Sequence, residues 1–122
     1  AEETVFKGVV VKHAIKTRVK NSVLIVECRD KAAKMTAVCK SKYFRDVTDS
    51  DVMEQLIDGH GLDKEIESTT VQHQQMVQYN CTDWDFMLCR TDASSMLCFT
   101  SDGKIKIGKP DFGAAPVLTI QY

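Results

Sequence analysis

The sequence predicts a small α+β domain with a mainly antiparallel sheet, or a partial barrel, and two short capped helices. Three observations indicate this class. Apolar residues alternate near the start of the chain, the same helix-start motif occurs twice, and an Asp-Gly turn joins two strand-like segments near the end. The 122 residues are enough for one domain with its own core. We expect residues 1–122 to be a single domain and an internal fragment of a larger protein.

Residues 4–29 are expected to form two antiparallel strands. Between 5 and 15 the apolar side chains recur at close to every second position, and 23–26 is a continuous apolar run, typical of a strand covered on both faces. Gly8 lies inside the first strand, where glycine indicates a bulge or a close backbone approach. The segment after these strands, 30–35, is expected to make one helical turn.

Two segments carry helix-start motifs about 34 residues apart. In the first, Thr48 is placed to cap a helix over 48–58, and Asp51 completes an aspartate form of the capping box. In the second, Thr82 and Asp85 stand in the same relation at the start of a helix over 83–93. Hydrophobic staples are expected as well, from Val47 to Val52 and from Cys81 to Phe86.

The remaining segments are predicted to be extended. Residues 67–79 form a polar extended segment in which Val71 and Val77 are the expected buried side chains, and 95–108 forms a hairpin around Asp102-Gly103. A last strand is expected over 117–122.

Charge is divided unevenly along the chain, although the net charge is only −1. Residues 1–45 carry a net +7 and residues 46–102 a net −10. Such a division is compatible with nucleic-acid binding, but the basic residues lack interleaved aromatics and an arginine cluster. Charge-complementary packing between neighbouring copies explains the same pattern, and we do not expect nucleic acid as a partner.

No chemistry-bearing motif was found. The five cysteines form no CxxC pair, and the three histidines stand at no fixed offset from them, so we expect buried reduced thiols, no metal, no cofactor and assembly in a reducing cytoplasm. The calcium-loop-like 46–50 fails because Asp51 replaces the required glycine and Ile57 the required glutamate. Asp83 and Asp85 are expected to face solvent in a first helical turn. Hence no catalytic residue and no enzyme activity are predicted, and no segment is long and apolar enough to span a membrane.

Three stretches together resemble the Vgr spike and hub proteins of type VI secretion and related contractile injection systems, which are similar to phage tail baseplate hub proteins. They are Phe-Lys-Gly-Val-Val at 6–10, the segment at 42–52 that enters the first helix, and the segment at 76–86 that contains Gln78-Tyr79, Thr82, Asp83 and Phe86. The strand-like 95–99 matches the strand that follows the helix in that family. The order of the stretches agrees along nearly the whole chain.

This resemblance implies a phage-tail-hub-like fold and a structural role through assembly. It implies a homotrimer in the intact protein, with a hexameric tube protein and a C-terminal spike domain as partners. It also implies assembly in the cytoplasm and delivery outside the cell. The residues expected to matter are architectural: Gly8, Thr48, Asp51, Gln78, Tyr79, Thr82, Trp84, Asp85 and Phe86. Gln78 and Tyr79 would fix the extended lead-in, and Trp84 and Phe86 would anchor the second helix, Trp84 by packing across a neighbouring strand or subunit.

A function of another class stays open: a small ligand- or nucleic-acid-binding module that uses the basic residues 1–45. A salt-dependent response to an oligonucleotide would favour that alternative.

Overall fold

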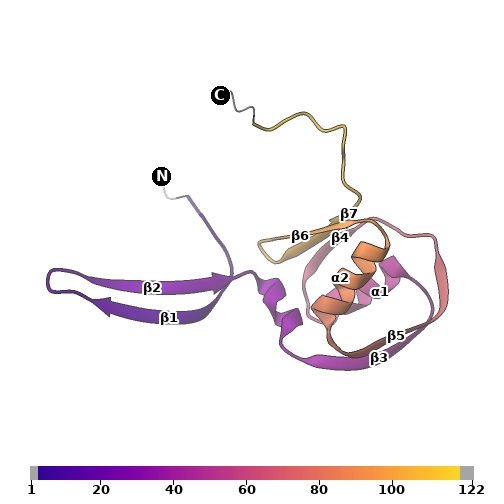
Figure 1. The fold of residues 1–122 in the computed structure, drawn as a ribbon, viewed down its shortest axis with the longest axis horizontal. Helices are drawn as coiled ribbons and strands as arrows, with labels where there is room; N and C mark the ends of the chain where they lie inside the picture. The colour runs from indigo at the N-terminus through magenta and orange to yellow at the C-terminus, as the bar shows by residue number, and fades with distance from the viewer. Residues whose placement is uncertain (1–2, 119–122) are drawn as a thin grey trace.

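The computed structural model describes residues 3–118, which form an extended arm and a body (Figure 1). The arm is an antiparallel hairpin of β1 (Val9–Thr17) and β2 (Ser22–Arg29). The body begins with the 3-10 helix η1 (Lys31–Thr36), which covers most of the segment where one helical turn was expected. Three separate sheets and no closed barrel are present in this part of the chain, in agreement with the predicted α+β class.

The body places two helices between two small sheets (Figure 1). β3 pairs antiparallel with β5, and the central strand β7 pairs parallel with β4 and antiparallel with β6. Helix α1 contacts β3 and β4, whereas α2 contacts β5 and β6. In chain order the elements are β3 (Cys39–Thr48), α1 (Asp49–Asp58), β4 (Asp63–Ile66), β5 (Gln72–Thr82), α2 (Asp83–Ala93), β6 (Leu97–Ser101) and β7 (Lys104–Gly108).

A β-α-β unit occurs twice in the body, as β3-α1-β4 and β5-α2-β6. The helices begin at Asp49 and Asp83, 34 residues apart, and the strands that follow them begin at the same offset. Even the backbone irregularity before each helix recurs, since Asp46 and Asn80 have positive φ angles of 50° and 43°. The repetition foreseen in the two helix-start motifs therefore extends over the whole unit.

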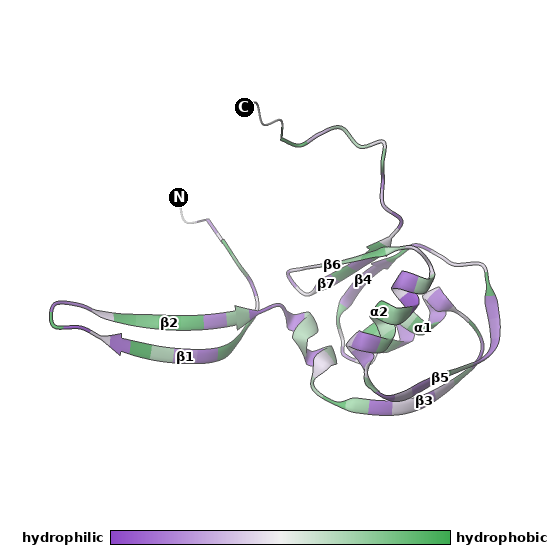
Figure 2. Ribbon diagram, in the orientation of Figure 1, coloured by the Kyte–Doolittle hydropathy of each residue, from purple (hydrophilic) through white to green (hydrophobic). Residues whose placement is uncertain are grey.

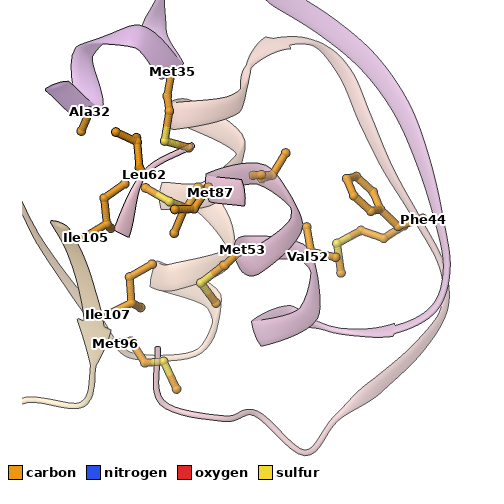
Figure 3. Close-up of a cluster of buried hydrophobic side chains, with 13 residues drawn as sticks. Ala32, Met35, Phe44, Val52, Met53, Leu62, Met87, Met96, Ile105 and Ile107 are labelled. Carbon is orange, nitrogen blue, oxygen red and sulfur yellow. The ribbon is translucent and has the colours of Figure 1, made fainter. Parts of the chain in front are cut away.

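The core lies between the helices and the sheets and is rich in methionine. All five methionines of the chain are buried, and Met53 and Met87 occupy equivalent positions of the repeat with no exposed surface (Figure 3). Methionine is unbranched and adapts to irregular gaps, which suits a space between two small, differently oriented sheets. The buried methionines are Met35, Met53, Met76, Met87 and Met96.

The burial pattern of β5 and of Val71, the residue before it, differs from the expected one. Val71 and Val77 are 63% and 42% exposed, whereas Met76 and Gln78 are buried. The prediction was wrong because it ranked the side chains by hydropathy, while the inward positions of β5 include a glutamine held by polar partners.

Strands β3 and β4 were not predicted at all.

The Asp-Gly hairpin is present as β6 and β7. Asp102 and Gly103 both have positive φ, 54° and 84°, as a type I′ turn requires. The last strand expected over 117–122 is not seen at Val117 and Leu118, and the rest of it lies outside the described residues.

Candidate assembly surface

The hairpin arm, defined as residues 9–29, carries nine exposed large apolar side chains. Every residue of β1 and β2 is exposed, and the arm extends away from the body without packing on it (Figure 2). The apolar run 23–26 was expected to be covered on both faces; within this chain that expectation is wrong. An isolated two-stranded hairpin is marginally stable in water, so this arm requires a surface to pack against. Its exposed apolar residues are Val9, Val10, Val11, Ile15, Val19, Val23, Leu24, Ile25 and Val26.

The strand register divides the arm into two unlike faces. Residues directly opposite each other share a face, and successive residues alternate. One face therefore carries the pairs His13–Val26, Ile15–Leu24 and Thr17–Ser22, and none of these side chains is a Lys, Arg, Asp or Glu. The other face carries Lys12–Glu27, Ala14–Ile25 and Lys16–Val23, so cationic side chains of β1 stand beside apolar side chains of β2. The first of these two faces is called the apolar arm face below.

The base of the arm is fixed to the body through Asp30. Its carboxylate accepts hydrogen bonds from the Ala32 N–H at 2.8 Å and from the Gly103 N–H at 3.0 Å, which joins η1 to the β6–β7 turn. Gly8 lies at the same base, directly before β1, and a Cβ placed on it would overlap the Arg29 carbonyl oxygen. The expected close backbone approach is therefore present at Gly8, and the bulge occurs at Val11, between the pairs of Val10 and Lys12.

The two helix starts are capped as the sequence indicates, with one difference. The Thr48 hydroxyl accepts from the Asp51 N–H, and the Asp51 carboxylate accepts from the Thr48 N–H at 2.8 Å, a complete capping box. The Thr82 hydroxyl accepts from the Asp85 N–H at 3.0 Å but donates to the Asp85 carboxylate at 2.6 Å. The second motif therefore has the hydroxyl cap, but its Asp85 carboxylate bonds the Thr82 hydroxyl where a capping box would have it bond the Thr82 N–H.

Asp49, the first residue of α1, is buried and held by two basic side chains. Arg90 Nε donates to its Oδ1 at 2.6 Å, and His73 Nε2 lies 3.1 Å from its Oδ2. Burial raises the pKa of Asp49, but the bonds from Arg90 and His73 outweigh burial and hold this pKa below its ordinary value. Sequence reasoning missed this cluster because its members lie far apart along the chain.

Asp83 has the same place in α2 and is also buried, which corrects the expectation that it faces solvent. Lys40 Nζ lies 2.5 Å and His60 Nε2 2.7 Å from its Oδ2, and Gln78 Nε2 donates to its Oδ1 at 2.9 Å. Burial raises the pKa of Asp83, yet these partners, with Lys40 foremost, lower it overall. Gln78 Nε2 also donates to the Cys81 carbonyl at 3.1 Å, so one side chain bonds both to the end of β5 and to the first residue of α2.

The three aromatic residues expected to matter have separate roles. Phe86 stacks on Phe44 with ring centroids 5.9 Å apart, and it packs against the core together with Trp84. Trp84 also lines a hollow of about 210 Å³ between the base of the arm and η1. Tyr79 lies in β5, in the extended segment before α2, but its side chain is 81% exposed and makes none of these contacts.

The cysteines are free thiols, but only two of them are partly buried. Cys28, Cys39 and Cys89 are exposed, which corrects the expectation of buried thiols. Burial raises the pKa of Cys98 to about 11. Within residues 3–118 no cluster of His, Cys, Asp or Glu is suited to a metal ion, and no helix has the length and apolar character of a membrane span.

Comparison with known proteins defines the family and the fold. The family described as the Alg8 N-terminal domain matches residues 1–122, so the chain belongs to this family. No curated protein matches the sequence.

Two solved structures of tail proteins share the fold. The tail protein from Neisseria meningitidis MC58 superposes with a TM-score of 0.75 at 14% identity, over 93% of this chain and 36% of that protein. The 43 kDa tail protein of prophage MuSo2 from Shewanella oneidensis gives a TM-score of 0.68 at 14% identity, over 80% of this chain and 31% of that protein. The chain therefore has a phage-tail-protein fold and spans about a third of the length of these proteins.

Proposed function

We propose that this chain is a structural module of a phage-tail-like assembly and acts by packing against neighbouring subunits, without catalysis. The observation that carries the proposal is the hairpin arm, whose two strands are exposed at every residue and include eight large apolar side chains. Monomeric soluble proteins rarely expose large contiguous apolar patches, and such patches mark interaction sites. The tail-protein fold supports the same conclusion.

The finer assignment follows from the sequence resemblance. We propose that the intact protein is a hub or spike component of a contractile injection apparatus, of the type VI or phage-tail kind, and that it is a homotrimer. A hexameric tube protein and a C-terminal spike domain are its proposed partners. It would assemble in the cytoplasm and leave the cell as part of the apparatus.

The experiment that tests this role compares the mass in solution of the chain with that of two triple variants, by light scattering over a range of concentrations. Ile15→Thr, Leu24→Thr and Val26→Thr together remove the apolar arm face and keep residues that favour strands. The matched control changes three exposed apolar residues of the body and tail, Tyr43→Thr, Val77→Thr and Phe112→Thr.

We expect the unmodified chain and the control variant to form oligomers, and the arm variant to be a monomer. If the unmodified chain is monomeric at every concentration, or if the arm variant associates as strongly as the control, the arm is not an assembly surface. A mobility shift with an oligonucleotide that disappears with added salt would instead favour the nucleic-acid-binding alternative.

A further inference from the structure

A polar cleft of about 380 Å³ opens where the end of α2 meets the loop between β4 and β5. Its volume lies in the range of small-ligand sites, roughly 300–1,000 Å³. The cleft is separate from the hairpin arm and contains the Asp49 cluster at its wall. The lining residues that matter here are Asp49, Thr69, His73, Arg90, Ser94 and Lys109.

The cleft wall presents hydrogen-bond donors that Asp49 does not use. Arg90 contacts Asp49 through Nε alone, and its two terminal nitrogens have no acceptor among the described residues. His73 faces Asp49 through Nε2. A neutral imidazole that donates through Nε2–H has an acceptor at Nδ1, so the free donors of this wall are those of Arg90. The side chains of Arg90 and His73 remain 24% and 29% exposed, so a ligand in the cleft can reach them. A guanidinium with two free nitrogens matches the two oxygens of a carboxylate.

The wall is held in place before any ligand binds. The Ser50 N–H donates to Thr69 Oγ1 at 2.9 Å, and the Thr69 N–H donates to Ser50 Oγ at 3.1 Å. These reciprocal bonds fix the β4–β5 loop on the start of α1. Asp49 meanwhile fixes Arg90 and His73, so neither side chain has to be ordered when a ligand enters.

The charges of the cleft suit a single negative charge. Arg90 and Lys109 contribute two positive charges and Asp49 one negative charge, within a segment whose residues 46–102 carry −10 overall. Glu67 lies beside the cleft, and its carboxylate is 3.7 Å from Lys109 Nζ, the longest ion pair of the described residues. The side chains of Lys109 and Glu67 are 66% and 46% exposed, so this ion pair contributes little and Lys109 Nζ can be reached by a ligand. Glu67 Oε2 also accepts from the Lys109 N–H at 2.9 Å, which keeps the Glu67 carboxylate beside the cleft. Asp49 and Glu67 repel any anion, and they repel a singly charged carboxylate less than a doubly charged phosphate.

We propose that this cleft binds a carboxylate group through the terminal nitrogens of Arg90 and the Lys109 ammonium. The carboxylate is either an acidic side chain of a protein segment or a free small carboxylic acid. The proposal is independent of the assembly role of the hairpin arm.

The test is a two-dimensional ¹H–¹⁵N NMR titration of the full chain with two probes at constant ionic strength. The probes are sodium acetate and the capped peptide acetyl-Ala-Glu-Ala-amide, and sodium chloride is the reference. We expect saturable shifts at the Arg90 Nε–H, the His73 ring and the backbone amides of Thr69 and Ser94. Tighter binding of the peptide identifies a protein segment as the source, and equal binding a free acid.

Two lysine variants decide whether the shifts report the cleft. Lys109→Gln removes one charge-assisted donor and is expected to weaken binding roughly tenfold. Lys106→Gln removes the same charge from the exposed face of β7, outside the cleft, and is expected to leave the affinity unchanged. Shifts that do not saturate, that sodium chloride reproduces, or that survive Lys109→Gln undiminished would overturn the proposal.

Discussion

The Nε atom of Arg90 donates a hydrogen bond to Asp49 Oδ1 across 2.6 Å, which joins the last turn of α2 to the first residue of α1. The opposite ends of the helices meet in a related way, because His60, two residues beyond α1, lies 2.7 Å from Asp83, the first residue of α2. The helices thus pack antiparallel, and each N-terminal carboxylate is held from the C-terminal end of its neighbour. Negative charge at a helix start and positive charge at a helix end both suit the helix dipole.

Substitution of Arg90 tests how much this clamp stabilises the body. Arg90→Gln leaves the buried carboxylate of Asp49 without its strongest partner, and we expect the free energy of unfolding to fall by about 1–3 kcal/mol or more. Urea unfolding followed by the fluorescence of Trp84 measures the change. Arg45→Gln removes the same charge from an exposed position of β3 and serves as the control. Equal unfolding midpoints for the two variants would contradict the clamp.

The second prediction concerns acid. The pKa of Asp83 lies below the ordinary 3.8, so the unfolded chain binds more protons than the folded chain as the pH approaches 3.8. The stabilisation from Asp83 is therefore complete above the unfolded pKa and is lost as the pH falls through the folded pKa. We expect the melting temperature of the unmodified chain to fall as the pH is lowered from about 5 toward 2.

Asp83→Asn removes this titrating group, so the melting temperature of the variant is expected to decrease less between about pH 5 and pH 2. At neutral pH its melting temperature is expected to be lower than that of the unmodified chain. The control is Asp92→Asn, the same change on the exposed side of α2, which should leave the pH profile unaltered. If Asp83→Asn retains the full acid sensitivity of the unmodified chain, the Asp83 cluster does not couple protonation to stability.

Local patterns were sufficient to predict the helices, and long-range polar contacts were not predictable. The starts of both helices follow from Thr48 and Thr82, because a cap is decided by residues within one turn. The burial of Asp83 depends on Lys40 and His60, which lie 43 and 23 residues away. A first-turn aspartate is usually solvated, so nothing in its immediate surroundings indicates burial.

The arm shows a different limit of sequence reasoning. The apolar run 23–26 correctly predicted a strand, but the same pattern implied cover on both faces that this chain does not supply. An apolar sequence pattern indicates that a surface becomes buried, but it does not indicate whether the element that covers this surface belongs to the same chain. Similarly, the positions of Met76 and Gln78 on β5 became clear only from the pairing with β3.

The third prediction concerns the cap of α2. Thr82→Ala removes the hydroxyl that accepts from the Asp85 N–H, and we expect a loss of about 1 kcal/mol in the free energy of unfolding. Thr82→Ser keeps the hydroxyl and should retain most of that stability. Thermal unfolding of the pair, recorded by circular dichroism, measures the difference. A serine variant as unstable as the alanine variant would show that the methyl group of Thr82, rather than its cap, stabilises this site.

The last prediction concerns the methionine core. Met87 lies on α2 with no exposed surface, at the position that Met53 occupies in the first β-α-β unit. Met87→Ala leaves a cavity between the helices and the sheets, and we expect a loss of about 2–5 kcal/mol in the free energy of unfolding. Met87→Leu conserves volume and should lose less than about 1.5 kcal/mol. Urea unfolding of both variants provides the values. Because the unit is repeated, Met53→Ala is expected to lower the free energy of unfolding as much as Met87→Ala does. If only one of the two substitutions is strongly destabilising, the two halves of the core differ in packing density.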